Sequence, residues 1–318
     1  MAERDSNQLQ RPKFKRQFLM PRYWGTWLLC LVLYVLTWLP RRWVMVLGKW
    51  LGNQFGQRNV KRRKIAETNL SLCFPDLTPQ QRSDFLNRHF QAYGCSILDM
   101  GLAFWASKNR INRLMTVEGI GHIESTVKSE PLLLVNYHLT TMEMLVTQVL
   151  PLYPTVSMMN FDKNPILTWL QYRGRKRFGD LKLVMRQEGL KPLISGMKEG
   201  RICIYFPDED FGEARHSEYV TFFGVEAARL NTVSRLAKIG RAAVILGVGF
   251  LDVESGKYNC VFSPPVEGLT GDTLADTALI NEKMEQLIRQ APEQYLWTFR
   301  WFKTRPGGQG NPYEIIDQ

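Results

Sequence analysis

Residues 132–143 read Leu-Leu-Leu-Val-Asn-Tyr-His-Leu-Thr-Thr-Met-Glu, and this stretch decides the fold class. The apolar run at its start predicts a buried strand that ends near Asn136. The residues after it predict a short loop that holds His138, followed by a helix that begins near Thr140. A buried strand that leads directly into a helix is typical of an α/β sheet covered by helices.

The chain on either side repeats this alternation. Further strand-like runs occupy residues 202–206 and 242–250, and helical runs occupy 141–150, 167–178, 190–198 and 230–238. Residues 243–252 and 258–262, joined by a turn at 254–256, resemble a hairpin at one edge of the sheet. Upstream, Thr78-Pro79 predicts the start of a helix that runs to about Trp105.

His138 and Glu143 are candidates for a general base and its partner. A neutral imidazole can remove a proton from an alcohol, and a carboxylate on its other ring nitrogen would fix the tautomer. Five residues of continuous helix turn through about 500°, which would place the two side chains about 140° apart. We therefore expect His138 to lie before the helix and Glu143 to reach back. Two alternatives stay open: Thr140-x-x-Glu143 also fits a capping box, and His138 also fits a buried, hydrogen-bonded histidine.

The charge balance favours anionic partners. The 318 residues include 41 Lys and Arg against 30 Asp and Glu, a net charge of +11, and 45% of them are hydrophobic. Anionic lipid, acidic carrier proteins and nucleic acid all fit such a surface, but no nucleic-acid-binding module is present. The five cysteines are widely spaced without a C-x-x-C pair, so neither a disulfide framework nor a zinc site is indicated.

Two charged clusters are further candidates for a site. Residues 173–177 contain four cations in five positions, which fits a phosphate clamp or a charged helix face. Residues 208–210 are Asp-Glu-Asp after a strand-like run; a metal site and a solvated turn both fit, and we expect no metal. No P-loop, G-x-G-x-x-G or G-x-S-x-G element occurs, so nucleotide-dependent and serine-hydrolase chemistry lack support.

The N-terminal region predicts contact with a membrane. Residues 1–22 form a basic tail, and the uncharged, tryptophan-flanked segment 23–40 is expected to be a retained membrane anchor. Its length lies at the short limit for spanning, so a helix lying in the interface and a buried core helix remain alternatives. An amphipathic run at 43–51 and the basic cluster 61–64 fit an anionic leaflet, although 61–64 also fits an ordinary solvated helix face.

Several segments in order resemble the late lipid A acyltransferases, the lauroyl and myristoyl transferases of the Gram-negative inner membrane. The chain departs from many members at Trp301, where they carry a second arginine. The matching segments are Asn69-Leu70-Ser71-x-Cys73-Phe74-Pro75, Asn136-x-His138-x-x-x-x-Glu143, Asn164-Pro165 with Trp169 to Arg175, Pro207-Asp208-x-Asp210-Phe211-Gly212, Ala291 to Trp297, and Phe302 to Pro306.

The resemblance implies a glycerolipid-acyltransferase-like α/β sandwich, a mixed sheet covered by helices, spanning residues 41–306 behind the anchor and before a tail at 307–318. It implies an enzyme, without a cofactor, that faces the cytoplasm at the bacterial inner membrane. The reaction implied is acyl transfer from acyl carrier protein to a 3-hydroxyacyl group of a Kdo-bearing lipid A precursor.

We expect His138, Glu143 and Arg175 to be catalytic, with Glu143 orienting the imidazole. An oxyanion would be stabilised by Arg175 or by backbone N–H groups near residues 136–143. Substrate-binding residues are expected at Asn136, Arg173, Asp208, Asp210, Arg300 and Lys303. An acyltransferase acting on a glycerophosphate or lysophospholipid is the alternative, and a non-catalytic lipid-binding protein of the same fold is the second.

Overall fold

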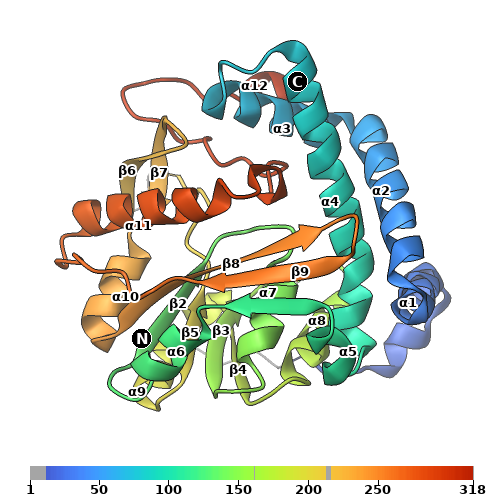
Figure 1. The fold of residues 1–318 in the computed structure, drawn as a ribbon, viewed down its shortest axis with the longest axis horizontal. Coiled ribbons are helices and arrows are strands. Elements are labelled where there is room, and N and C mark those ends of the chain that lie inside the picture. The colour runs from blue at the N-terminus through green and yellow to red at the C-terminus, as the bar shows by residue number, and fades with distance from the viewer. Residues whose placement is uncertain (1–11, 161, 213–215, 318) are drawn as a thin grey trace, which may run out of the picture.

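The computed structural model describes residues 12–160, 162–212 and 216–317, and its centre is a seven-stranded sheet (Figure 1). The strand order is β1-β9-β8-β2-β5-β3-β4, with every neighbouring pair parallel except β8 and β9. The strands are β1 (Met115–Glu118), β2 (Leu132–Asn136), β3 (Thr155–Met159), β4 (Leu181–Met185), β5 (Ile202–Tyr205), β8 (Ala243–Asp252) and β9 (Lys257–Phe262). A separate antiparallel ribbon pairs β6 (Ser217–Phe222) with β7 (Val225–Leu230).

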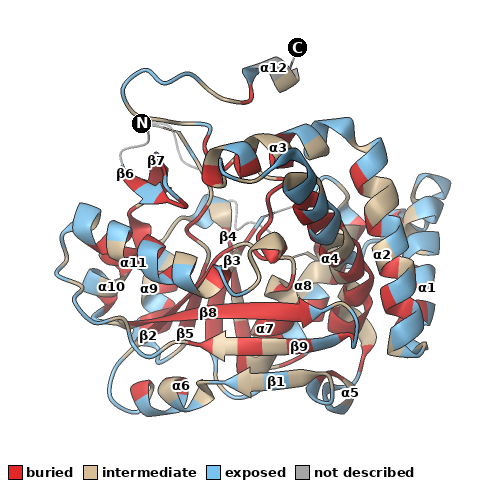
Figure 2. Cartoon of the chain, turned by 45° about the horizontal axis from the view of Figure 1, so that its top comes forward, coloured by how far each residue is buried: buried red, intermediate tan, exposed pale blue. Residues whose placement is uncertain are grey.

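Helices cover both faces of the sheet, so its central strands are buried on both sides (Figure 2). In β2, Leu133 and Val135 face a core that includes α9, α10 and α11, whereas Leu132 and Leu134 face one that includes α7 and the C-terminal half of α4. This two-sided burial explains why the strand is a continuous apolar run. These helices are α4 (Pro79–Trp105), α7 (Met142–Val149), α9 (Lys191–Lys198), α10 (Thr232–Gly240) and α11 (Thr273–Ile288).

Of the remaining helices in the described residues, four lie near the two ends of the chain and three lie between residues 108 and 176. They are α1 (Trp24–Trp38), α2 (Arg41–Arg58), α3 (Val60–Cys73), α5 (Lys108–Asn112), α6 (Ile120–Thr126), α8 (Pro165–Lys176) and α12 (Glu314–Asp317). Short 3-10 turns occupy Arg16–Leu19, Pro21–Tyr23, Arg186–Glu188 and Pro292–Gln294.

Helix α4 begins where the sequence predicts. Thr78 and Gln81 form a reciprocal capping box with Pro79 in the first turn, and the helix ends at Trp105. Helix α2 packs closely along α4 because glycines line the contact: a Cβ on Gly52 would lie 1.9 Å from the Phe90 carbonyl oxygen. The prediction of an α/β fold covered by helices is confirmed.

The expected hairpin is present, but its position at the edge of the sheet is wrong. β8 and β9 form the antiparallel pair, yet β1 pairs with the outer side of β9. The four-residue β1 was missed because its alternating, half-exposed residues carry a weak apolar signal.

The membrane-spanning anchor is not supported. Among the described residues no helix combines the length and hydropathy that crossing a bilayer requires. Helix α1 has 15 residues, and its Leu33 and Leu36 are buried in the core that contains α4. Its other side is exposed and apolar, with Trp24, Leu28, Leu31, Val35 and Trp38 uncovered (Figure 2).

Candidate active site

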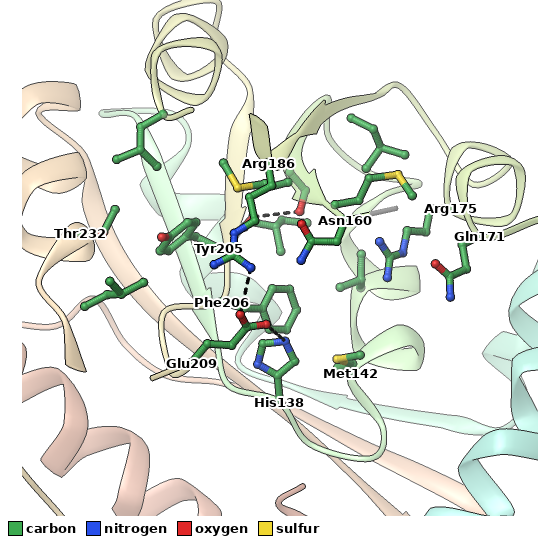
Figure 3. Close-up of a pocket in the computed structure, with 18 of the residues that line it drawn as sticks. His138, Met142, Asn160, Gln171, Arg175, Arg186, Tyr205, Phe206, Glu209 and Thr232 are labelled. Carbon is green, nitrogen blue, oxygen red and sulfur yellow. Dashed lines mark hydrogen bonds and ion pairs between the residues drawn. The ribbon is translucent and has the colours of Figure 1, made fainter. Parts of the chain in front are cut away.

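The candidate site lies where four neighbouring parallel strands end. His138 follows β2, Asn160 follows β3, Arg186 follows β4 and Glu209 follows β5, and all four side chains line one cavity of about 570 Å³ (Figure 3). The carboxyl ends of parallel strands are the usual place for a ligand in open α/β sheets. Much of the remaining wall is apolar, including Val146, Met158, Leu181, Leu183 and Ile204.

His138 is held by Asp208. The backbone N–H of His138 donates to Asp208 Oδ2 at 2.8 Å, and Nδ1 lies 2.6 Å from Asp208 Oδ1. A carboxylate accepts, so Nδ1 carries the proton and Nε2 is the basic nitrogen of the neutral ring. The Asp208 side chain is fully buried and also accepts from the Tyr295 hydroxyl at 3.1 Å.

Glu143 does not orient His138, contrary to the expectation from sequence. Glu143 accepts a bidentate pair from Arg175, with Nε to Oε2 at 3.1 Å and a second bond from Nη2 to Oε1. The predicted loop and helix start are confirmed, since His138 precedes α7. The orienting carboxylate, however, comes from the adjacent strand. The Thr140 capping box is also absent, because α7 begins after Thr141, whose hydroxyl donates to the Gly249 carbonyl.

Strand register explains the His138–Asp208 contact. Val135 pairs with Tyr205 in the parallel β2–β5 ladder. His138 and Asp208 each lie three residues beyond that pair, so the two chains deliver them to the same place. The sequence signal for this contact is the presence of two apolar runs, 132–135 and 202–206, each followed at the same distance by one of the two side chains; their pairing and register come from the fold.

The environment raises the pKa of His138 above its usual value. Burial opposes protonation of the ring, but the charge and hydrogen bond of Asp208 outweigh it, and the charge of Glu209 adds to them; Arg175 acts in the opposite direction. The proton of an imidazolium at this position is therefore stabilised, which suits a group that takes up a proton and later returns it.

Glu209 approaches the free nitrogen of His138. Its Oε1 lies 3.8 Å from Nε2, too far for a hydrogen bond, and its Oε2 accepts from Arg186 at 3.2 Å (Figure 3). The Arg186 guanidinium in turn lies 3.9 Å from the centre of the Phe211 ring. Glu209 lies in the acidic cluster 208–210 and Tyr295 in the segment 291–297, but the sequence predicted no individual role for Glu209, Arg186 or Tyr295.

The partly buried Arg175 lies across the cavity from His138 (Figure 3). Burial opposes its charge, but the ion pair with Glu143 outweighs this and raises the pKa of Arg175. The guanidinium therefore stays charged beside the cavity. Arg173, by contrast, is exposed and packs over the Trp169 ring, and it does not line this cavity.

The other predicted site residues have positions outside the cavity. Asn136 is fully buried at the end of β2, and Asp210 accepts from the backbone N–H groups of Gly212 and Thr304. Arg300 and Lys303 line a second cavity, which Glu209 also borders. Asp208 and Glu209 thus lie on opposite nitrogens of His138, and Asp210 binds backbone N–H groups. Among the described residues, no group of three or more His, Cys, Asp or Glu side chains is placed to hold a metal ion.

Buried polar side chains hold the C-terminal loop against the site. Asn69 donates to the carbonyl oxygens of Trp297 and Phe299, both at 2.7 Å. The buried Arg229 donates to the Trp301 carbonyl at 2.6 Å, and Trp301 stacks on Tyr295 with ring centres 4.9 Å apart. Trp301, the departure noted in the sequence, is therefore part of the buried wall behind His138.

Comparison with known proteins identifies the relatives of the chain. Residues 11–304 match the family model described as bacterial lipid A biosynthesis acyltransferase. The chain is 35% identical to the lipid A biosynthesis lauroyltransferase of Escherichia coli strain K12, over 95% of this chain and 99% of that protein. It is 34% identical to a lipid A biosynthesis acyltransferase of Haemophilus influenzae over 93% of each chain, and 27% identical to the E. coli lipid A biosynthesis myristoyltransferase over 100% and 98%.

Proposed function

Because the chain belongs to the bacterial lipid A biosynthesis acyltransferases, we propose that it transfers a fatty acyl chain from acyl carrier protein to a 3-hydroxyacyl group of a Kdo-bearing lipid A precursor. The observation that carries the proposal is His138, with its Nδ1 bound to a buried carboxylate and its Nε2 at a largely apolar cavity. A base beside an apolar cavity suits a reaction between an alcohol and a fatty acyl thioester.

In the proposed mechanism, His138 Nε2 removes the proton of the acceptor hydroxyl as its oxygen attacks the thioester carbonyl carbon. The carbon–sulfur bond of the tetrahedral intermediate then breaks. The imidazolium returns its proton to the departing thiolate, which leaves as a thiol. Asp208 holds the tautomer and stabilises the imidazolium, so no covalent acyl-enzyme is needed.

We assign the oxyanion to Arg175, with Glu143 as the residue that positions it. A charged guanidinium across the cavity from the base is placed to stabilise negative charge on the carbonyl oxygen. Glu143 thus remains important for catalysis, but it acts by positioning Arg175 and not by orienting the imidazole.

The membrane side of the proposal rests on α1 and α2. The exposed apolar residues of α1 continue on α2 with Trp43, Val46 and Trp50. We propose that this surface lies in the lipid interface on the cytoplasmic side of the bacterial inner membrane, where the lipid acceptor and the carrier protein can both reach the cavity.

The test measures the mass gained by a Kdo-bearing tetra-acylated lipid A precursor with several acyl carrier protein thioesters. We expect wild type to add one acyl mass and His138→Ala to lose activity by orders of magnitude while keeping its fold. Acylation of a lysophospholipid instead would support the alternative acceptor. A wild type that acylates neither would support a non-catalytic lipid-binding protein.

A further inference from the structure

A second cavity, of about 670 Å³, meets the active-site cavity at Glu209, which lines both. One wall comes from the start of α3, with Lys61 and Arg62. The other comes from the C-terminal loop, with Phe299, Arg300, Trp301 and Lys303. We call this cavity the basic cleft.

The basic cleft has an excess of positive charge. Among the described residues, four cations from two segments about 240 residues apart in sequence line it, against two carboxylates. Glu209 pairs with Arg186, Asp210 accepts backbone N–H groups of Gly212 and Thr304, and Lys61 and Arg300 also have interactions of their own. The electrostatic field of the cleft therefore favours an anionic group.

The two walls of the basic cleft are fastened together. Arg62 donates from Nη1 to the Thr298 carbonyl at 2.8 Å and packs over the Phe299 ring at 5.6 Å. Asn69, two turns further along α3, binds the same loop through the carbonyls of Trp297 and Phe299. The cations are thus carried on a scaffold held in place before any ligand arrives, which lowers the entropic cost of binding.

The basic cleft also adjoins the catalytic imidazole. Phe299 and Trp301 stack on each other with ring centres 5.2 Å apart. The His138 ring packs against the same pair, 6.1 Å from Phe299 and 6.0 Å from Trp301. A molecule whose charged part occupies the cleft would therefore have its neighbouring groups close to His138.

We propose that the basic cleft binds the phosphate or carboxylate groups of the acceptor's sugar head group. This inference rests on the proposed function. It assigns the largely apolar cavity to the donor's acyl chain and the cationic one to the acceptor's anionic head, with the reacting hydroxyl between them at His138. Lys61, from the 61–64 cluster that by sequence fits either an anionic leaflet or a solvated helix face, becomes a substrate-binding residue in this arrangement.

The test compares two double variants with the same charge change. Lys61→Ala/Lys303→Ala removes two cations of the cleft. Lys128→Ala/Lys283→Ala removes two exposed lysines that line neither cavity and lie outside the 61–64 cluster. For each enzyme, KM is measured for the lipid A precursor at saturating acyl carrier protein thioester, and then for the thioester at saturating precursor.

We expect the cleft variant to raise KM for the precursor by about 10- to 100-fold, the usual effect of losing charge-assisted contacts. Its kcat and its KM for the thioester, and all constants of the control variant, should stay within about twofold of wild type. An unchanged KM for the precursor would overturn the proposal. A rise in KM for the thioester instead would also overturn it, because the cleft would then hold the carrier protein.

Equilibrium binding separates this proposal from the proposed reaction. The His138→Ala protein, with and without the two cleft substitutions, is titrated with the precursor in detergent micelles. Weaker binding by the triple variant supports the cleft even if wild type transfers no acyl group. Equal binding by both proteins overturns the cleft even if wild type is an active acyltransferase.

Discussion

At the scale of single residues, the site depends on the buried carboxylate of Asp208, which binds both the ring and the backbone of His138. We expect Asp208→Asn to lower kcat by about 100- to 10,000-fold, because an amide neither fixes the required tautomer nor stabilises an imidazolium. Acyl-transfer rates of the two proteins at saturating substrates check this. Thermal unfolding is the control, and a variant that folds normally but keeps wild-type kcat would contradict the role of Asp208.

The neighbouring Glu209 contributes to the pH dependence, in addition to the larger effect of Asp208. Its charge helps to raise the pKa of His138, and only the neutral ring can act as the base. Activity should therefore fall as the pH drops below this raised pKa. Glu209→Gln removes one of the charges that raise the pKa of His138 and leaves Asp208 and Arg175 in place. The acid limb of kcat/KM should therefore move to lower pH. A pH profile of kcat/KM measures the shift, and a limb displaced to higher pH would contradict this assignment.

At the scale of elements, the approach of α2 to α4 requires glycine at position 52, where a Cβ would lie 1.9 Å from the Phe90 carbonyl oxygen. We expect Gly52→Ala to destabilise the protein by about 1–3 kcal/mol, because two helix backbones would have to separate. Gly121→Ala on α6 is the matched control, because the added Cβ meets nothing within 4 Å. Alanine there should stabilise the protein by up to about 1 kcal/mol. Denaturant unfolding of both variants checks this, and equal midpoints would show that α2 adjusts freely.

At the scale of the whole molecule, the free energy of unfolding should decrease as the pH falls, and His89 is one group responsible. This residue joins α4 to the C-terminal segment. Its ring is fully buried, and Nδ1 donates to the Glu293 carbonyl at 2.8 Å. Burial lowers the pKa of His89 to about 4. Because the unfolded chain binds this proton near pH 6.5, the stability contributed by the neutral ring is present above pH 6.5 and is lost as the pH falls toward 4.

Between pH 7 and pH 5, this group alone should reduce the free energy of unfolding by about 2 kcal/mol. Urea unfolding at the two pH values measures the loss, and His89→Gln, which does not titrate, should show a loss smaller by that amount. An identical pH dependence in the two proteins would mean that His89 is not the group responsible.

Features that depend on neighbours along the chain could be predicted from the sequence alone. Thr78, Pro79 and Gln81 set the start of α4 through local hydrogen bonds, and the apolar run 132–135 set a buried strand with His138 just after it. Only the tertiary structure decided which carboxylate serves His138. Glu143 is five residues away but is held by Arg175, whereas Asp208 is 70 residues away and reaches the ring because β2 and β5 pair in register. The same holds for the basic cleft, whose two walls are held together by bonds from Asn69 and Arg62 to the carbonyl groups of a distant loop. Contacts of this kind depend on strand register and helix packing, which no local pattern encodes.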